Sequence, residues 1–442
     1  MEAGPFAGRR LHFVGIGGAG MSGLALVARR LGAEVTGSDR AESSYSARLR
    51  AAGIEPRSGH DRPPPEGAEV VVSTAIGADN PELAAARAAG ARILHRGDLL
   101  GEVSALKRTI AVGGTHGKTT TASMTALTLA EAGRDPAFLI GGELRALGTN
   151  ASWGNGDWAV IEADESDRSF LKLSRDVAVV TSMELDHHAT YRSLGDLERS
   201  FREFAEPAGL AVLGPGVDLG LDGSLSYGIG GGDLRAESVK LLPLGSRFTV
   251  EGVAVELAVP GRHNVLNALA ALAACRAAGV EPAAAAPGLA RFTGAGRRFE
   301  DHGASTAGAR VFDDYAHHPT EVRATLEAAR TQDPGRLVAC FQPHLYSRTR
   351  LLAREFGEAL ALADLVVVLD VYPARERAED FPGVSGLLVA GAAADAAGGR
   401  PVWWLPRHDE AERFLREELR EGDLLLTMGA GDVDELARRL TS

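Results

Sequence analysis

A stretch of glycine, lysine and threonine residues between positions 109 and 121 has the composition of a phosphate-binding loop. It reads TIAVGGTHGKTTT, in which a short apolar run turns through glycines into Lys118 and three threonines. A strand that passes through such a turn into a helix leaves backbone N–H groups unpaired at the helix N-terminus, where they converge on a phosphate. We therefore expect Lys118 to reach the β- and γ-phosphates of ATP and the hydroxyl of Thr119 to ligate Mg²⁺.

The rarity of lysine in this chain adds weight to this interpretation. Only four of the 47 basic residues are lysines, and one of them is Lys118. The loop matches the general nucleotide-binding pattern in a shortened form, G-x-x-x-G-K-T, because Val112 stands where that pattern has its first glycine. An ordinary glycine-rich turn before a helix is the alternative. The predicted nucleotide-binding residues of the loop are Gly114, Thr115, His116, Gly117, Lys118, Thr119 and Thr120.

Carboxylates and imidazoles follow two further apolar segments. The first, DWAVIEA, carries Glu162 at its end, and the second, DVAVVT, leads into SMELDHH with His187 and His188. The carboxyl ends of parallel strands line one crevice, the same edge at which a phosphate loop lies. Because Mg²⁺ bound with a nucleotide usually takes one or two protein ligands, we predict Thr119, Glu162 and His187 as metal ligands. Solvated loop residues are the alternative, above all for His188 and for residues 164–167.

A second glycine-rich turn lies near the N-terminus. Residues 10–39 have the pattern of a strand, a glycine turn, a helix and a second strand, with Gly15, Gly17 and Gly20 in a G-x-G-x-x-G spacing. Asp39 ends the second strand, where the dinucleotide fingerprint has an acid that binds ribose. Such a turn suits any nucleotide diphosphate, NAD included, and a packing turn without a ligand is the alternative. The alternation of strand and helix continues beyond it and predicts a parallel sheet.

The remainder of the chain predicts added β structure and a further α/β domain. Short alternating segments lie between residues 207 and 259, and four apolar segments followed by polar loops (RVFDDY, LVACF, LVVVL, DLLLT) fill the last third. The segment GAGRRF contains Arg297 and Arg298, which suit a phosphate clamp, although an ordinary surface pair is as good an explanation. A helix that begins near PGRHN carries Asn264 and Asn267. An asparagine can cap a helix or contact an adenine, and we expect Asn264 to cap this helix, whereas both roles stay open for Asn267.

Length and composition limit the architecture and the partners. A chain of 442 residues suggests about three domains, which we place at residues 1–105, 106–288 and 289–442. The net charge of -12 argues against a nucleic acid or an anionic membrane as the main partner. Cys275 and Cys340 are expected to be buried free thiols. With no export signal or membrane span predicted, a cytoplasmic location is expected.

Taken together, the motifs resemble those of the Mur ligase family, in one order along nearly the whole chain. They are GIGGAGMSG, GTHGKTTT, EADESD, ELDH, GRHNVLN, GAGRRF, DDYAHHPTE, QPHLYSRT and MGAGD. The resemblance implies an α/β fold of three domains: an N-terminal Rossmann-like domain that binds UDP rather than NAD, a central P-loop ATPase-type domain with added β structure, and a C-terminal Rossmann-like domain that binds the incoming amino acid.

The resemblance also implies an activity. An ATP-dependent ligase of this kind joins L-alanine to the lactyl carboxylate of UDP-N-acetylmuramate, through an acyl phosphate, during peptidoglycan precursor synthesis. ATP and Mg²⁺ are the implied cofactors, and a monomer or weak homodimer is expected. The implied catalytic residues are Lys118, Glu162, His187, Arg297 and Arg298, and Asn264 and Asn267 join the nucleotide-binding set. The implied substrate-binding residues are Gly15, Gly17, Gly18, Gly20, Asp39, His60, Ser73, His317, His344, Tyr346, Arg348 and Asp370.

The chain departs from the family pattern at two points, and three other functions stay open. No lysine lies between Lys172 and Lys240, so the carbamylated lysine of several sister ligases is absent, and Ala189 stands where the family tends to place an acid. The first alternative is a recycling ligase that attaches a whole tripeptide to the same sugar nucleotide, although residues 17–23 (GGAGMSG) disfavour it. The second is an NAD-dependent oxidoreductase, supported by the glycine fingerprint alone. The third is a nucleotide-gated scaffold without catalysis.

Overall fold

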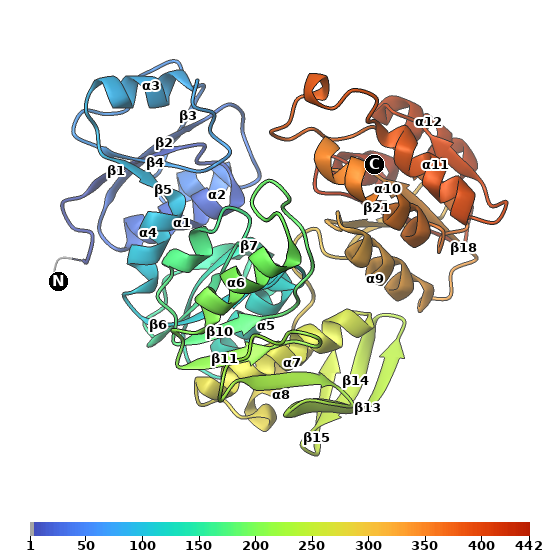
Figure 1. Ribbon diagram of the computed structural model, residues 1–442, viewed down its shortest axis with the longest axis horizontal. Coiled ribbons are helices and arrows are strands. Elements are labelled where there is room, and N and C mark those ends of the chain that lie inside the picture. The colour runs from blue at the N-terminus through green and yellow to red at the C-terminus, as the bar shows by residue number, and fades with distance from the viewer. Residues whose placement is uncertain (1–3) are drawn as a thin grey trace. The chain divides into compact units, whose positions relative to one another are not determined.

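The computed structural model describes residues 4–442 (Figure 1). Contacts between residues divide the chain into two units. The first unit consists of residues 4–236, 250–253 and 266–289, and the second of residues 237–249, 254–265 and 290–442. The first unit contains two sheets, each with its own helices, and the second contains the C-terminal sheet. The α/β class expected from the sequence is therefore confirmed.

The N-terminal sheet has the strand order β3-β2-β1-β4-β5, and all of its pairs are parallel. The chain leaves β1 toward β2 and later returns to the other side of β1, so that the order reverses between β1 and β4. A ligand of an open α/β sheet binds at such a reversal, outside the carboxyl ends of the strands. The elements are β1 (Arg10–Val14), α1 (Ala19–Arg30), β2 (Glu34–Asp39), α2 (Ser46–Ala51), β3 (Pro56–Ser58), β4 (Glu69–Val72), α3 (Pro81–Ala88), β5 (Ile93–His95) and α4 (Arg96–Ser104).

The central sheet places β6 between β10 and β9, with both pairs parallel. Its strands within the first unit follow the order β13-β12-β11-β10-β6-β9-β7-β8, and only residues 234–236 of β13 belong to this unit. Helix α1 of the N-terminal part contacts both β2 and the edge strands β7 and β8 of the central sheet. The elements are β6 (Arg108–Gly113), α5 (Lys118–Glu131), β7 (Ala137–Leu144), β8 (Thr149–Ser152), β9 (Trp158–Glu162), β10 (Val177–Val180), α6 (Leu194–Ala205), β11 (Leu210–Leu213), β12 (Leu225–Ile229), α7 (Arg262–Ala277) and α8 (Pro282–Ala290), with short 3₁₀ turns at Arg145–Leu147 and Ser169–Lys172.

The second unit contains a β-hairpin and a six-stranded sheet of order β16-β17-β21-β18-β19-β20. Every pair of this sheet is parallel except β16 with β17. Apolar clusters cover both faces of the sheet, as a buried parallel sheet requires. The elements are β13 (Leu234–Leu242), β14 (Gly245–Val250), β15 (Val253–Leu257), β16 (Glu300–Ala304), β17 (Arg310–Asp314), α9 (Pro319–Arg330), β18 (Arg336–Phe341), α10 (Tyr346–Leu360), β19 (Leu365–Val368), α11 (Gly386–Ala396), β20 (Val402–Trp404), α12 (His408–Glu418), β21 (Asp423–Met428) and α13 (Asp434–Thr441), with a 3₁₀ turn at Ala378–Asp380.

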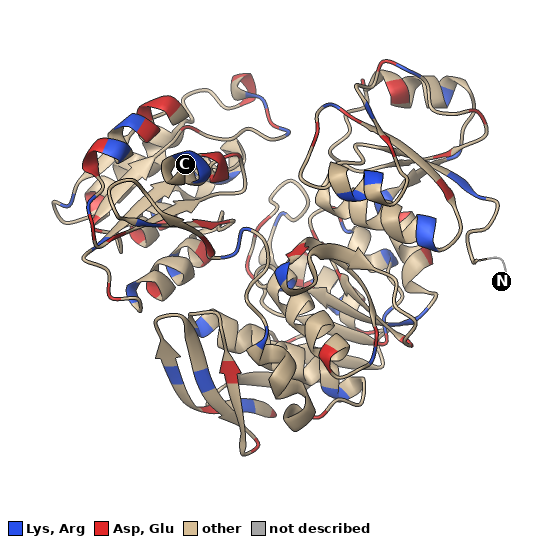
Figure 2. Cartoon of the chain, turned by 180° about the vertical axis from the view of Figure 1, so that it is seen from behind, with Lys and Arg blue, Asp and Glu red and all other residues tan. Residues whose placement is uncertain are grey.

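Charged side chains of both signs are interspersed along the chain (Figure 2). Many of them form ion pairs between neighbouring elements, such as Arg9 with Glu69 at 2.8 Å. The two cysteines are buried and free, as expected, and burial raises the pKa of both thiols. Within residues 4–442, no helix has the length and apolar character needed to cross a membrane.

Candidate active site

The glycine turn after β6 forms a backbone cradle at the start of α5. Gly114 and Gly117 have φ angles of 121° and 81°, in the left-handed region that favours glycine. A Cβ atom would collide with Thr181 at the first position and with Asn267 at the second. Gly117 caps α5 without a side-chain hydrogen bond, so the N–H groups of the first helical turn are available to a phosphate. The cradle therefore fits the polyphosphate of ATP.

Lys118, the first residue of α5, points back into this turn. Its Nζ donates to the carbonyl oxygens of Gly114 (2.7 Å) and Thr115 (3.1 Å) and lies 2.9 Å from Glu165 Oε2. Burial opposes its charge, yet the carboxylates of Glu165 and Asp164 raise the pKa of Lys118 above its ordinary value. The ammonium group is therefore charged where the β- and γ-phosphates would lie.

A carboxylate at the end of β9 contacts the threonine that follows Lys118. Glu162 Oε1 accepts a hydrogen bond from Thr119 Oγ1 at 2.9 Å, and Glu162 Oε2 accepts one from the N–H of Gly141 at 2.6 Å. Burial opposes the ionisation of Asp164, but the charges of Lys118 and Arg96 lower its pKa to about 2. These anionic oxygens and the threonine hydroxyl are the donor set that Mg²⁺ prefers, so the residues present fit this ion.

His187 lies at the same edge of the sheet, in the loop after β10. Its Nε2 is 3.5 Å from Glu165 Oε1 and 3.8 Å from Asp186 Oδ2. Its φ angle of 52° is a left-handed conformation, which costs energy in a residue with a side chain and often accompanies a functional site. The structure thus places Lys118, Glu162 and His187 at one edge of the sheet, and Glu165 contacts both Lys118 and His187.

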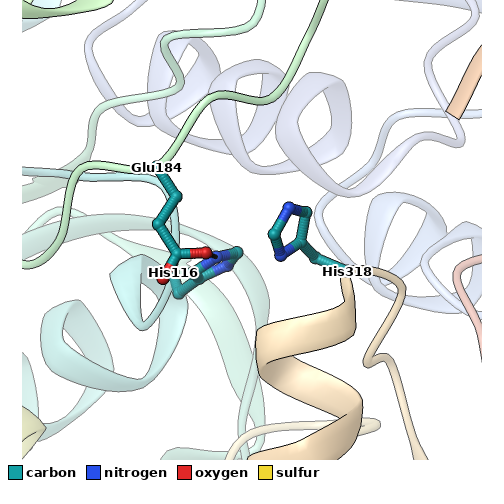
Figure 3. Close-up of side chains that lie close together, drawn as sticks. All are labelled: His116, Glu184 and His318. Carbon is teal, nitrogen blue, oxygen red and sulfur yellow. Dashed lines mark hydrogen bonds and ion pairs between the residues drawn. The ribbon is translucent and has the colours of Figure 1, made fainter. Parts of the chain in front are cut away.

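The loop side chain of His116 pairs with a carboxylate that the sequence did not connect to it. His116 Nε2 lies 3.2 Å from Glu184 Oε2 (Figure 3). The same loop is tied to Glu184 through Thr115, whose hydroxyl donates to the Glu184 carbonyl (3.0 Å) and accepts from the Glu184 N–H (2.9 Å). The remaining loop residue in the predicted nucleotide set, Thr120, is buried in the first turn of α5.

A cavity of about 200 Å³ joins the N-terminal glycine turn to this edge. Its walls come from α1 and α4 on one side and from β7 and β9 on the other, and they include Gly20, Arg96, Gly141, Glu162 and Asp164. Arg96 Nη2 lies 3.5 Å from Asp164 Oδ2. The cavity therefore lies between the first turn of α1 and the carboxylates at the end of β9.

In the N-terminal sheet, the side chains of two predicted substrate-binding residues form hydrogen bonds with other groups of the protein. Asp39 Oδ2 accepts from the N–H of Gly17 at 2.8 Å, so this carboxylate orders the glycine turn itself. His60 Nδ1 contacts Ser38 and Glu82, both at 3.0 Å. The other predicted residues of this group lie along the carboxyl edge of the sheet: Gly15 after β1, Gly18 at the N-cap of α1, Gly20 in its first turn and Ser73 after β4.

Arg297 and Arg298 have different surroundings. The guanidinium of Arg297 donates to Asp313 Oδ2 (2.9 Å) and to the carbonyl oxygens of Gly431 and Gly429 (both 2.8 Å). Arg298 lies 3.7 Å from Glu321 and over the ring of Tyr315. The bonds of Arg297 are all internal to the second unit, which indicates that it shapes the segment that presents Arg298.

The predicted amino-acid-binding residues gather at the carboxyl ends of β17, β18 and β19. The rings of His317 and His344 have centroids 5.9 Å apart, and Arg348 Nη1 lies 3.1 Å from His344 Nδ1. The stacked pair of Tyr346 and Phe381 lies in the same unit. Asp370 Oδ1 accepts from the N–H groups of Val371 (2.8 Å) and Gly386 (2.9 Å), so it caps the start of α11.

The two asparagines of the GRHN segment differ in environment. Helix α7 begins at Arg262, so Asn264 lies inside the first turn rather than at the cap, and its Nδ2 donates to the carbonyl of Pro260 at 2.7 Å. Asn267 Oδ1 accepts from Thr121 of α5 at 3.3 Å and lies against Gly117. Asn267 is thus adjacent to the phosphate cradle, as a nucleotide-binding residue must be.

Models of three protein domains match successive parts of the chain. "Mur ligase family, catalytic domain" matches residues 10–108, "Mur ligase middle domain" residues 112–275, and "Mur ligase, glutamate ligase domain" residues 297–431. This chain belongs to the Mur ligase family. The family resemblance of its motifs is therefore confirmed.

Relatives of this Mur ligase match it from end to end. A UDP-N-acetylmuramate–L-alanine ligase of Streptomyces coelicolor is 46% identical over 99% of this chain and 98% of its own length. The crystal structure of a UDP-N-acetylmuramate–alanine ligase from Thermotoga maritima is 30% identical with a TM-score of 0.84 and covers 98% of both chains. A murein peptide ligase from Psychrobacter arcticus is 25% identical with a TM-score of 0.73, over the same 98% of each chain.

Three side chains of the site escaped the sequence analysis of this Mur ligase. Glu165 is 1% exposed and contacts both Lys118 and His187. The sequence did not identify it because EADESD contains several carboxylates and nothing in their spacing distinguishes one from another. Glu184 lies in the segment SMELDHH, but its pairing with His116 depends on the fold. Arg96 is the first residue of α4 and belongs to no motif in the sequence. It is identified as a site residue because it lines the cavity.

Proposed function

We propose that this Mur ligase joins L-alanine to the lactyl carboxylate of UDP-N-acetylmuramate with cleavage of ATP to ADP and phosphate. The proposal rests on the full-length similarity to proteins named UDP-N-acetylmuramate–L-alanine ligase. The cluster of Lys118, Glu162 and His187 beside a backbone cradle supports it, because catalysis of phosphoryl transfer is mainly positioning and electrostatic stabilisation.

The chain's own residues have separable roles in this reaction. The first turn of α5 binds the phosphates through its N–H groups, and Lys118 offsets the charge that develops on the γ-phosphoryl group. A Mg²⁺ ion held by Thr119 and Glu162, and a second metal ion held by His187, would neutralise phosphate charge and orient the oxygens. The lactyl carboxylate attacks the γ-phosphorus and displaces ADP to give an acyl phosphate. The amine of L-alanine then attacks the acyl carbon and displaces phosphate, with loss of a proton, to form the amide. Arg298 is assigned a catalytic role as a further positive charge.

We infer that three successive parts of the chain bind the three substrates. Residues 1–105 bind the UDP-sugar, residues 106–288 bind ATP, and residues 289–442 bind the amino acid. The cavity that runs from the glycine turn of α1 to Glu162 supports the first assignment, since the lactyl group must reach the phosphate site. We also propose a cytoplasmic location and a monomer or weak homodimer, in keeping with precursor synthesis from nucleotide substrates.

A murein peptide ligase is the second candidate, because such an enzyme from Psychrobacter arcticus has the same fold over 98% of both chains. The deciding experiment measures phosphate release from ATP with Mg²⁺ and UDP-N-acetylmuramate, with L-alanine or with the tripeptide as acceptor. Release that requires L-alanine and yields an amide product supports the proposal. Release only with the tripeptide assigns the second candidate, and no release with either acceptor contradicts both.

A further inference from the structure

The side chain of Glu82 is completely buried in the N-terminal part of the chain, among two histidines and an arginine. Its Oε1 accepts from His12 Nε2 at 2.8 Å and from Arg57, and its Oε2 accepts from His60 Nδ1 at 3.0 Å and from the hydroxyl of Ser38. A buried carboxylate is tolerated only with such partners. Burial opposes its ionisation, but the hydrogen bonds from His12, Ser38 and His60 lower the pKa of Glu82 to about 2, so it is an anion at neutral pH.

This cluster ties together elements that are distant in the sequence. Its members come from β1, β2, β3, the loop after β3, and the first turn of α3. The apolar packing on this face of the sheet is small, since its fully buried members are Val14, Val70 and Ala86. The hydrogen bonds of Glu82 therefore contribute much of what fixes α3 and the loop of His60 against the sheet.

The same cluster reaches the glycine turn through Ser38. The hydroxyl of Ser38 donates to Glu82. The backbone carbonyl oxygen of Ser38 accepts from the N–H groups of Gly15 (2.8 Å) and Ile16 (3.0 Å). The next residue, Asp39, accepts from Gly17 and, through its carbonyl, from the N–H of Gly59 at 2.7 Å. The turn that would hold a diphosphate and the loop that carries His60 are thus anchored at the same strand end.

Glu82 also determines which ring nitrogen of His60 carries the proton. A carboxylate only accepts hydrogen bonds, so His60 Nδ1, at 3.0 Å from Glu82 Oε2, carries the hydrogen. In the neutral ring Nε2 then presents a lone pair. The side chain of His60 is 9% exposed at the carboxyl edge of the sheet, so this nitrogen suits a hydrogen-bond donor on a ligand, such as the imide N–H or a ribose hydroxyl of a nucleoside.

We propose that Glu82 is a positioning residue for nucleotide recognition. It holds His60 with Nδ1 protonated, so that His60 Nε2 accepts a hydrogen bond from the uridine of the sugar nucleotide, and it steadies the glycine turn through Ser38. This inference rests on the proposed function insofar as the N-terminal sheet binds UDP-N-acetylmuramate.

Steady-state kinetics of Glu82→Gln and His60→Gln test the proposal. Each variant should raise the KM for UDP-N-acetylmuramate about tenfold or more, with kcat and the KM values for ATP and L-alanine nearly unchanged. Ala86→Gly is the matched control, because it weakens the packing of the same helix on the same face and leaves the carboxylate intact. An equal rise of KM in Ala86→Gly, or a loss of kcat without a rise of KM in Glu82→Gln, would overturn the positioning role.

Calorimetric measurement of the binding of UDP, 2′-deoxy-UDP and N3-methyl-UDP identifies the group of the nucleotide that donates a hydrogen bond to His60 Nε2. In the unaltered protein one analogue should bind about tenfold more weakly than UDP, and in His60→Gln this difference should shrink. Weakening by the deoxy analogue identifies the ribose hydroxyl, and weakening by the methyl analogue identifies the imide. If neither analogue binds more weakly, or the difference persists in His60→Gln, the contact through Nε2 is wrong.

The tautomer of His60 can be read without any ligand. In protein with ¹⁵N-labelled rings on its 12 histidines, the His60 signals are assigned by their loss in His60→Gln. We expect a protonated Nδ1 and an unprotonated Nε2, and a shift toward protonated Nε2 in Glu82→Gln. A protonated Nε2 in the unaltered protein would refute the proposal. Because this measurement needs no nucleotide, it still decides the role of Glu82 if UDP fails to bind, a result that would instead refute the proposed function.

Discussion

The ammonium group of Lys118 lies 2.9 Å from Oε2 and 3.1 Å from Oε1 of Glu165, a carboxylate that is almost completely buried. The two residues form an ion pair at the place where the phosphates of ATP are expected. A ligand phosphate must therefore compete with Glu165 for the same cation, and each charge is costly to bury without the other.

Removal of Lys118 alone should destabilise the protein as well as inactivate it. In Lys118→Met the carboxylate of Glu165 loses its ammonium partner, and the free energy of unfolding of the first unit should fall by about 3–5 kcal/mol. The double variant Lys118→Met with Glu165→Gln should recover most of this stability without recovering ligation. Urea unfolding and phosphate release measure the two effects. Equal free energies of unfolding of the single and double variants would show that the unpaired carboxylate of Glu165 does not destabilise the protein.

Replacement of Glu162 should change the dependence on Mg²⁺. Because Glu162 accepts from Thr119 and lies at the predicted metal site, Glu162→Gln should raise the Mg²⁺ concentration for half-maximal activity about tenfold or more. Asp157→Asn is the control, since Asp157 is an exposed acid just before the start of the same strand. A Mg²⁺ titration of both variants checks the assignment, which fails if the two titration curves coincide.

The adjacent arginines should separate into a structural and a catalytic residue. Arg297→Lys loses most of the hydrogen bonds to Asp313, Gly429 and Gly431, so we expect a loss of about 3 kcal/mol in stability. Arg298→Lys should keep the thermal midpoint and lower kcat by about 10²-fold. Thermal unfolding and initial rates on both variants test this division. It is wrong if Arg298→Lys unfolds earlier than Arg297→Lys.

The fold and the phosphate loop were predictable because local sequence determines them. Gly114 and Gly117 adopt φ angles that favour glycine, and Lys118 follows them directly, so spacing alone predicts the cradle. The C-terminal strands end in polar loops as expected, whereas β16 and β20 were missed because their short segments, EDHGA and VWW, lack the apolar alternation of a half-buried strand.

Contacts over long sequence separations could not be predicted. Glu82 meets His12 across 70 positions, and no spacing rule connects a glutamate in the first turn of a helix to a histidine in a strand. Likewise, the choice of Glu165 among the carboxylates of EADESD depends on how the loop after β9 turns. Arg297 and Arg298 are chemically identical in the sequence, and only the position of Asp313 and of two carbonyl groups distinguishes them.

The stability of the second unit should depend on pH through His263. Burial and the charge of Arg298 lower the pKa of this imidazole to about 4. In the unfolded chain its pKa is about 6.5, so between these values the unfolded state binds more protons, and stability falls as the pH is lowered from 6.5 to 4. Because the side chain is only partly buried, we expect a loss of about 1 kcal/mol. His263→Gln should remove this part of the pH dependence, as measured by denaturant unfolding of both proteins at pH 7.5 and pH 5. Parallel losses of stability in the two proteins would show that another group is responsible.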